Sequence, residues 1–399
     1  MDKKIQVVSF QSLSASSGAG MARLGYLLSD ELQKRKLLQN FIVHSKGKFD
    51  TPFPSIPVSP LSRFYLLILN KFVNAFSVPS YKFRLWQEML FDWFCELRLN
   101  KETDILFTTN AFLYRTFRQA KRNGTLIVLL PGTPEENYIY RLVSEENTRM
   151  GINTTDAYTY KKRIAYFNKS IQYVDKVIGA LPTAYTTYME AEHKAEVVKI
   201  LGHMTPDFKQ SSNSKPVNNA EFHIGYIAHT VILKGLHYLL EAWQEIQKNN
   251  PNINIKLHIG GAMDAPIQKY IDQHFPNLSN VNWMGHVSNI PAFMQKLDVL
   301  VVPSLIDGEP MTALEAAHNA IPSIITDHCG ASELLSRGNS GSWIIPIRDK
   351  NAIIEKILYA YHNRAACKEK GTNAKYNIDN YSMESFIVEV ANYLESIQR

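Results

Sequence analysis

The chain has 399 residues, 45% of them hydrophobic and 20% charged, with a formal net charge of +6 at pH 7. This is the composition of an ordinary globular protein without low-complexity tracts, and the length predicts two domains. The small positive excess suits an anionic ligand or an anionic membrane face without specifying either.

Cysteine spacing and hydrophobicity limit the cellular compartment in which the protein is expected. The three cysteines are scattered and show no metal-binding spacing, which suits a reducing compartment and predicts no metal. The most apolar window, 64–76, is interrupted by polar residues and falls short of the roughly 20 apolar residues that span a bilayer. Because the amino-terminal residues are typical of a first strand rather than a signal peptide, we expect a cytoplasmic protein.

The first half of the chain alternates short apolar runs with helical segments. Strands are predicted at residues 5–10, 41–45, 104–108, 126–130, 176–180 and 197–201, and helices at 21–36, 61–99, 161–175 and 182–192. Residues 51–60 hold four prolines and are predicted to form a loop. This alternation is typical of a parallel sheet covered by helices.

A glycine- and serine-rich loop follows the first predicted strand. Ser17, Gly18 and Gly20 lie where the backbone must turn before the next helix. The loop is either a phosphate- or substrate-approach loop or an ordinary turn between strand and helix. It is not the full dinucleotide fingerprint, because Arg23 stands where a third glycine would be.

The predicted helix at 61–99 mixes aromatic residues with about twice as many basic as acidic side chains. A basic, aromatic helix can lie on an anionic membrane interface, which would make the protein peripheral on the inner face of the plasma membrane. The alternative is that most of these aromatic residues are core. Nucleic-acid binding is disfavoured, since no recognised nucleic-acid module accompanies the segment.

A polar turn, PGTPEEN at 131–137, follows the predicted strand at 126–130. Ligands of parallel sheets bind at the carboxyl ends of strands, so Glu135 is a candidate on the acceptor side. The alternative is a loop that opens a helix with acidic residues in its first turn.

A polar segment rich in serine and asparagine, 208–221, is the predicted linker. It separates an amino-terminal domain at 1–207 from a carboxyl-terminal domain at 222–380, and 381–399 is predicted as a last helix that packs back on the first domain. Strands of the second half are predicted at 223–228, 254–259, 281–283, 299–303, 323–326 and 342–345, and helices at 235–247, 267–274, 290–295, 311–319, 350–363, 373–381 and 382–398.

The segment 299–333 reads as strand, loop, helix, strand, loop and the start of a further helix. Its first loop and helix carry Asp307 and Glu315, and the loop after the first strand of this half carries His229 and Lys234. Such loops line one edge of a parallel sheet. Cations and helix amino termini would bind a diphosphate, and carboxylates would accept hydrogen bonds from sugar and ribose hydroxyls, which predicts a nucleotide-sugar site.

Two segments resemble glycosyltransferase family four. They are PSLIDGEPMTALEAAHNAIPSIITDHCGASELL, at 303–335, and IAHTVILKGLHYLLEAW, at 227–243. The resemblance covers the second half closely and the first half loosely. It implies an α/β protein of the GT-B fold, with two Rossmann-like domains whose parallel sheets face each other across a cleft, and a retaining transfer reaction.

The resemblance also implies roles for single residues. Lys234 would neutralise the departing diphosphate, Asp307 would contact the transferred sugar, and Glu315 would hold the ribose hydroxyls. These three are the predicted catalytic residues. The predicted donor-binding residues are Gly18, Gly20, His229, Val287, Glu309, Met311 and Thr312. Among them, Met311 and Thr312 would offer backbone N–H groups, and Val287 would lie near the base.

Several positions depart from the family pattern. Asp307 is one methylene shorter than the usual glutamate, and His229 replaces an arginine, so bidentate phosphate binding is lost there. Pro310 stands where many relatives have glycine and cannot donate an N–H. No histidine occurs in PGTPEENY, at 131–138, where many relatives have one near the acceptor.

The predicted function is transfer of a sugar from a UDP- or GDP-sugar to a saccharide or lipid-linked acceptor in cell-surface polysaccharide synthesis, with no cofactor. One rival is a catalytically silent binding or scaffold protein, and another is a GT-B phosphorylase or epimerase. At the site itself, Thr312 and Glu315 also fit a capping box, in which Glu315 would only satisfy a helix terminus.

Overall fold

The structure, a computed structural model, describes residues 3–13, 20–46, 49–59, 78–205, 221–338 and 340–398. The chain divides into two compact units. Unit 1 comprises Met1–Arg141, Thr155–Met204 and Ser382–Arg399, and unit 2 comprises Leu142–Thr154 and Thr205–Tyr381. The predicted linker lies, except for Glu221, outside the described residues.

Unit 1 is built on a seven-stranded sheet in the order β3-β2-β1-β4-β5-β6-β7, with all its pairs parallel. Its strands are β1 (Ile5–Ser9), β2 (Leu38–Val43), β3 (Ser55–Pro57), β4 (Ile105–Thr108), β5 (Leu126–Leu129), β6 (Lys176–Gly179) and β7 (Glu196–Lys199). Its helices are α1 (Met21–Lys34), α3 (Ser80–Arg98), α4 (Tyr114–Arg122), the first part of α5 (Glu136–Met150), α6 (Lys161–Ile171), α7 (Pro182–Glu190) and α15 (Met383–Ser396).

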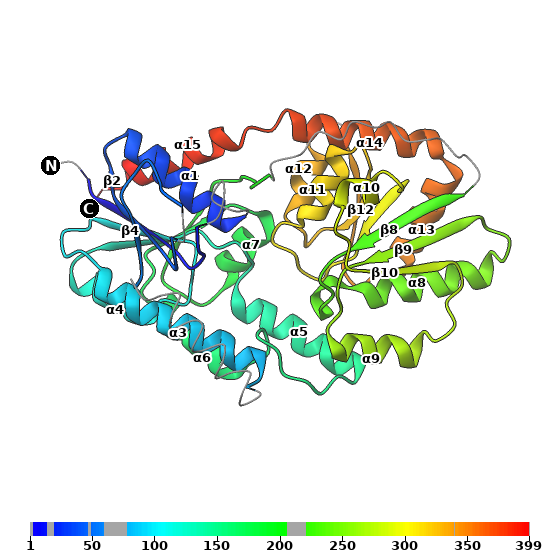
Figure 1. Cartoon of the computed structure of the whole chain (residues 1–399), viewed down its shortest axis with the longest axis horizontal. Helices are drawn as coiled ribbons and strands as arrows, with labels where there is room; N and C mark the ends of the chain where they lie inside the picture. Colours follow the sequence, from blue (N-terminus) through cyan, green and yellow to red (C-terminus); the bar gives the residue numbers. More distant parts are fainter. Residues whose placement is uncertain are drawn as a thin grey trace. The chain divides into compact units, whose positions relative to one another are not determined.

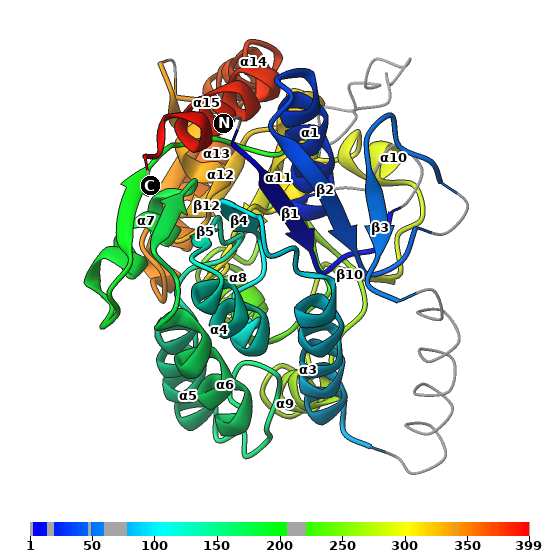
Figure 2. The same ribbon diagram turned by 90° about the vertical axis from the view of Figure 1, so that its left-hand side faces the viewer.

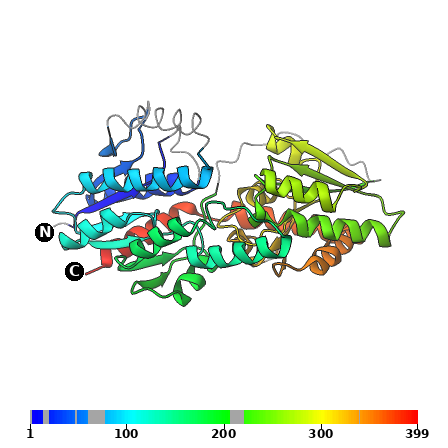
Figure 3. The same cartoon turned by 90° about the horizontal axis from the view of Figure 1, so that it is seen from below.

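Helices cover both faces of this sheet. Helices α1 and α15 pack together on one face, and α3, α4 and α6 form a layer on the other (Figures 1 and 2). The second layer is seen from outside in Figure 3. Because the central strands are buried on both faces, they are short apolar runs rather than alternating sequences.

Two elements of unit 1 differ from the sequence predictions. The loop predicted at 51–60 is wrong in its centre, because β3 pairs in parallel with β2 at the edge of the sheet. Pro57 is tolerated there, since an edge strand leaves one side of its backbone unpaired. Helix α4 was not predicted, because four of its nine residues are basic and it buries only Thr116, Phe117 and Ala120. Of the helix predicted at 61–99, residues 61–77 lie outside the described residues.

Unit 2 contains a six-stranded parallel sheet in the order β10-β9-β8-β11-β12-β13. The strands are β8 (Phe222–Ile227), β9 (Ile255–Gly260), β10 (Val281–Gly285), β11 (Val299–Val302), β12 (Ser323–Thr326) and β13 (Ser342–Ile345). The helices are the 3₁₀ turn η2 (Ile232–Lys234), α8 (Leu236–Asn249), α9 (Ala265–His274), α10 (Ile290–Met294), α11 (Met311–His318), α12 (Ala331–Ser336), α13 (Lys350–His362) and α14 (Arg364–Asp379). Helices α8 and α13 pack together on one face, and α11, α12 and α14 on the other (Figure 1). The prediction of two parallel α/β sheets is confirmed.

The carboxyl-terminal half of α5 packs with unit 2, although the sequence placed it in the first domain. Its Glu146 is fully buried and accepts hydrogen bonds from His237 Nε2 at 3.1 Å, Arg149 Nε at 2.6 Å and Arg348 Nε at 3.0 Å. Burial alone would raise the pKa of Glu146, but the bonds from His237 and Arg149 outweigh it and lower the pKa to about 2. A buried charge with this many donors is tolerated because it is fully paired.

Among the described residues, no helix is long and apolar enough to cross a membrane.

Candidate functional site

The strand order of unit 2 reverses between β8 and β11, and the loops that follow these two strands meet. Leu305 N donates to Leu233 O at 2.8 Å. Gly235 has a φ of 64°, and a Cβ atom there would lie 1.9 Å from the carbonyl oxygen of Pro303, so only glycine fits. This close approach brings Lys234 beside Asp307, at the point where ligands of open parallel sheets bind.

Lys234 and Asp307 form an ion pair across the two loops. Their side chains are 27% and 13% exposed, so the pair opens to solvent on one side. The backbone of Asp307 is held on both sides, because its N–H donates to His328 O at 3.2 Å and its carbonyl oxygen accepts from Gly330 N at 3.0 Å. The sequence predicted both residues in one site but gave them separate partners, so the ion pair is new.

Glu315 lies in α11, half-buried, and its side chain has no polar partner among the described residues. Burial raises the pKa of its carboxyl. The capping-box interpretation is wrong, because α11 begins at Met311 with Pro310 as its N-cap and no side chain caps it. Thr312 is therefore a helical residue, and the carboxylate of Glu315 is left as an acceptor for a ligand.

The amino terminus of α11 adds backbone donors. Met311 and Thr312 are its first two residues, and an α-helix leaves its first N–H groups without an internal partner. Pro310 offers none. Glu309 is half-buried in the same loop and makes contacts of its own.

His229 and Val287 lie at the ends of the neighbouring strands. His229 Nε2 is 3.1 Å from Asp264 Oδ1, and the side chain of His229 is 67% exposed. Val287 packs over the end of β9, where a Cβ atom on Gly260 would lie 2.7 Å from Val287 Cγ2. Neither residue contacts the Lys234–Asp307 pair in any contact that the structure records among the described residues, so their donor-binding roles stay predictions.

The predicted sites of unit 1 have mixed outcomes. Gly18 lies outside the described residues. Gly20 is the N-cap of α1 with a φ of 57°, a conformation that favours glycine. Glu135 is buried, and its carboxylate accepts from Tyr138 N at 2.8 Å and from Asn137 Nδ2 at 2.6 Å. These bonds fit a residue that opens a helix, and the acceptor-side role of Glu135 stays a prediction.

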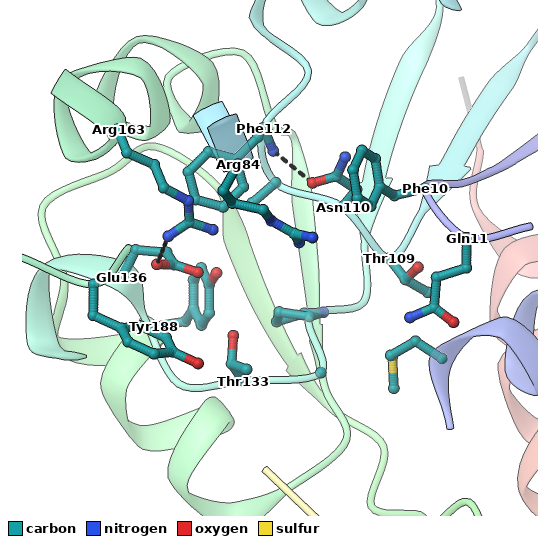
Figure 4. A pocket seen from close by; sticks show the side chains of 15 residues that line it. Phe10, Gln11, Arg84, Thr109, Asn110, Phe112, Thr133, Glu136, Arg163 and Tyr188 are labelled. Atoms are coloured by element: carbon teal, nitrogen blue, oxygen red, sulfur yellow. Dashed lines mark hydrogen bonds and ion pairs between the residues drawn. The ribbon is translucent and has the colours of Figure 1, made fainter. Parts of the chain in front are cut away.

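Unit 1 has a pocket of about 240 Å³ at its own point of strand-order reversal, between β1 and β4. Phe10 follows β1, Asn110 follows β4 and Thr133 follows β5, and all three line the pocket (Figure 4). Helix α3 contributes Arg84, and α6 contributes Arg163.

Arg84, Arg163 and Glu136 are the charged residues that line this pocket, and both arginines pair with Glu88. Arg163 is only 5% exposed and donates through Nε to Glu88 Oε2 at 3.0 Å and through Nη1 to Glu136 Oε2 at 2.9 Å. Arg84 donates to Glu88 Oε1 at 2.9 Å. Burial raises the pKa of Glu136, which the charge of Arg163 only partly offsets.

Sequence reasoning missed this pocket. Arg84 was noticed only as part of a basic and aromatic helix, and Arg163 only as part of a predicted helix. No local pattern connects residues that the topology draws from α3, α5 and α6. The pocket residues share one feature that the sequence could have shown: each lies near the carboxyl end of a predicted strand or on a helix next to such an end.

The described residues contain no group of three or more His, Cys, Asp or Glu side chains that would hold a metal ion. The absence of a cofactor stays a prediction.

Two all-parallel, doubly wound sheets, each with polar groups at its point of reversal, define a two-domain Rossmann-like protein of the GT-B class. The crystal structure of Anabaena Alr3699/HepE in complex with UDP-glucose shares this fold, with a TM-score of 0.60 and 16% identity over 98% of this chain and 100% of that one. Residues 207–377 match the family model of the glycosyl transferases group 1.

Curated relatives match the same half of the chain. An uncharacterized glycosyltransferase, MJ1178 of Methanocaldococcus jannaschii, is 28% identical over 183 residues, 45% of this chain and 50% of that protein. The capsular polysaccharide biosynthesis glycosyltransferase CapM of Staphylococcus aureus is 27% identical over 175 residues, 43% of this chain and 45% of that protein. The chain thus spans about half the length of the curated relatives it matches.

Proposed function

We propose that this protein is a retaining glycosyltransferase that moves a sugar from a nucleotide-sugar donor to a saccharide or lipid-linked acceptor. The observation that carries the proposal is the Lys234–Asp307 pair at the strand reversal of unit 2, inside the segment that matches the family. The name of CapM and the UDP-glucose bound to HepE support a polysaccharide setting and a UDP-sugar donor.

The roles of the donor-site residues follow from their charges and from what they leave open. A diphosphate would draw Lys234 away from Asp307, since it carries more charge than one carboxylate, and Lys234 would then neutralise the leaving group. Asp307, held rigid by its backbone bonds, would be free to accept from hydroxyls of the transferred sugar. Glu315 would accept from the ribose, and Met311 and Thr312 would offer backbone N–H groups. The protein supplies position and charge rather than a nucleophile.

The pocket of unit 1 is the proposed acceptor pocket. It lies at the carboxyl ends of β1, β4 and β5, and it has aromatic walls together with charged and polar groups. Such a lining suits a sugar ring, which presents apolar faces and a polar rim.

We also propose that the protein is cytoplasmic and peripheral on the inner face of the plasma membrane. The described part of the predicted interface helix, α3, exposes large apolar side chains in a row on one face. They are Trp86 at 39%, Met89 at 44%, Trp93 at 43% and Leu97 at 63%. Phe91 and Cys95 of the same helix are buried in the core, so the support for a membrane-facing surface comes only from the exposed row.

One observation favours the rival of a catalytically silent binding protein. Two of the predicted donor-site residues face carboxylates of the protein itself, Lys234 with Asp307 and His229 with Asp264. In a catalytically silent protein that binds no diphosphate, these two pairs would stay intact.

A thermal-shift screen and a donor-hydrolysis assay separate the two. UDP, GDP, ADP and their sugar conjugates are added to the wild type, to Lys234→Ala and to Lys248→Ala, an exposed lysine at the far end of α8. We expect one nucleotide series to raise the melting temperature of the wild type and of Lys248→Ala, and Lys234→Ala to lose at least ten-fold in donor turnover. No response of the wild type to any nucleotide would favour the silent protein, and full turnover in Lys234→Ala would remove that lysine from the site.

A further inference from the structure

The pocket of unit 1 contains a guanidinium group that the protein only partly uses. Arg84 is held through Nε by Glu88, and its guanidinium carbon lies 4.6 Å above the centre of the Phe10 ring. Neither of its Nη groups has a partner among the described residues. The close view shows the guanidinium inside the pocket (Figure 4).

This arrangement fixes the orientation of the Arg84 guanidinium group. One carboxylate and one aromatic face hold the plane of Arg84, while the Nη groups stay available. A planar, pre-oriented guanidinium is the side chain that best matches the two oxygens of a carboxylate or phosphate. Glu88 compensates its charge only in part, because the same carboxylate also accepts from Arg163 at 3.0 Å through both Nε and Nη2.

Elsewhere in the pocket the open groups include both acceptors and donors, and Nδ2 of Asn110 is a buried donor without a partner among the described residues. Oε2 of Glu136 is engaged by Arg163, and no described residue bonds to Oε1. The side chain of Thr133, which also lines the cavity, has no partner among the described residues either. A ligand that satisfies these groups must bring groups that both donate and accept, as the hydroxyls of a sugar do.

The shape agrees with a single ring. Phe10, Phe112, Tyr158 and Tyr188 provide aromatic walls, and Arg163 covers Phe112 with its guanidinium carbon 3.8 Å from the ring centre. The volume of about 240 Å³ lies below the roughly 300–1,000 Å³ of pockets for drug-sized ligands. A volume of this size suits one sugar ring inside the pocket.

We infer that this pocket binds a sugar ring bearing an acidic group, with Arg84 gripping the acid and Glu136 accepting from a ring hydroxyl. The inference rests on the proposed function in one respect, namely that this ring is the end of the acceptor chain. A carboxylate, as in a uronic acid, and a phosphate ester share the required chemistry. A neutral sugar would leave the Nη groups of Arg84 without an anionic partner.

The test is a saturation-transfer NMR titration of the full chain with three probes: methyl glucoside, methyl glucuronide and glucose 6-phosphate. Every titration is repeated in Lys234→Gln, so that binding at the donor site of unit 2 is recognised and subtracted. We expect the wild type to bind at least one acidic probe ten-fold or more tightly than methyl glucoside, and the better acid identifies the source.

Variants then locate the effect. Arg84→Gln is expected to abolish the preference for the acid, Arg84→Lys to retain part of it, and Lys82→Gln, which removes a charge from the same helix outside the pocket, to leave it unchanged. Circular dichroism melting of each variant checks the fold. Arg84→Lys keeps the positive charge but loses the planar guanidinium. A loss of acid binding in this variant without a change in melting temperature is therefore a loss of recognition and not of folding.

Three results would overturn the inference: no binding of either acidic probe, equal binding of the acidic and neutral probes, or a preference that survives Arg84→Gln. Failure of the proposed function is distinguishable, because it appears as an absence of donor hydrolysis by the wild type. That absence would not alter any of these titrations.

Discussion

The carboxylate of Asp307 has two possible partners. It pairs with Lys234 in the structure, and the family resemblance implies that it contacts the transferred sugar. Asp307→Asn removes the negative charge that pairs with Lys234, so a diphosphate no longer competes with that carboxylate for the lysine. We therefore expect the affinity for free UDP to stay equal or to rise up to about ten-fold, the size of one charge-assisted bond. The affinity for the matching UDP-sugar is expected to fall relative to UDP.

Isothermal titration with UDP and with the UDP-sugar on the same preparation gives both numbers. Asp327→Asn is the matched control, since Asp327 is an exposed aspartate bonded to His328 in the loop after β12. An equal loss of affinity for both ligands would contradict the sugar-contacting role of Asp307.

Glu315 predicts a pH dependence. Only the ionised carboxylate accepts from two ribose hydroxyls, and burial raises the pKa of this group above its ordinary 4.5. Nucleotide affinity should therefore be complete above the raised pKa and should be lost as the pH falls through it, at a higher pH than for an exposed glutamate. Glu315→Gln should weaken UDP and abolish this pH step.

Inorganic pyrophosphate is the control ligand for this titration. It lacks a ribose, so its affinity should not change at the pKa of Glu315. A pH step of the same size for pyrophosphate, or a step that persists in Glu315→Gln, would mean that Glu315 does not hold the ribose.

At this scale the sequence predicted where Lys234, Asp307 and Glu315 lie but not what they touch. The carboxyl ends of parallel strands meet at one edge, so their proximity followed from the topology. The ion pair depends on the tight turn at Gly235, whose positive φ no pattern specifies. The pocket around Arg163 was out of reach because its charged partners come from three separate helices.

Among the elements, α3 buries one face in the core of unit 1 and exposes a row of large apolar side chains on another. Helix α3 packs on α4, which packs in turn on α6, and these two helices contain no acidic residue and eight basic ones, of which Arg163 is buried. Tryptophan rings beside basic side chains are typical of an anionic membrane interface. We expect co-sedimentation with vesicles that contain phosphatidylglycerol, and little with phosphatidylcholine alone.

Replacing both Trp86 and Trp93 by serine should lower vesicle binding about ten-fold or more, because partial burial of each indole is worth on the order of 1 kcal/mol. Trp283→Ser is the matched control, since this tryptophan on β10 of unit 2 is equally exposed, at 43%. Binding that is indifferent to lipid charge, or that survives the double substitution, would mean that α3 does not meet a membrane.

The sequence patterns also show which elements can be predicted. Central strands such as β4 and β11 are buried along their whole length and almost entirely apolar, and they were found. Edge strand β3 was hidden by its prolines, and α4 by its charges, because both owe their structure to neighbours rather than to their own pattern. The layer that α4 forms with α3 and α6 is a property of packing that a single segment does not encode.

For the whole molecule, the division into units does not follow the order of the chain. Each unit completes itself with a distant segment: unit 1 with α15, and unit 2 with residues 142–154. Nothing in the local sequence of 142–154 signals this, since the cluster around Glu146 forms only when α8 and the turn at Arg348 are in place. A domain boundary predicted from composition assigns residues 142–154 to the same domain as their neighbours in sequence, whereas they pack with unit 2.

This organisation predicts how fragments fold. A fragment of residues 205–381 contains the whole sheet of unit 2 but lacks Glu146, the partner of buried His237, and the fully buried Val143. Removing one side of a buried charged cluster costs about 3–5 kcal/mol, which corresponds to a melting temperature lower by about 10 °C or more in a unit of this size. The same fragment with 142–154 joined through a flexible linker should regain that difference, as measured by circular dichroism, and the joined fragment carrying Glu146→Ala should regain only part of it. If 205–381 alone melts as cooperatively and as late as the joined fragment, the cluster around Glu146 is dispensable and unit 2 is complete without the end of α5.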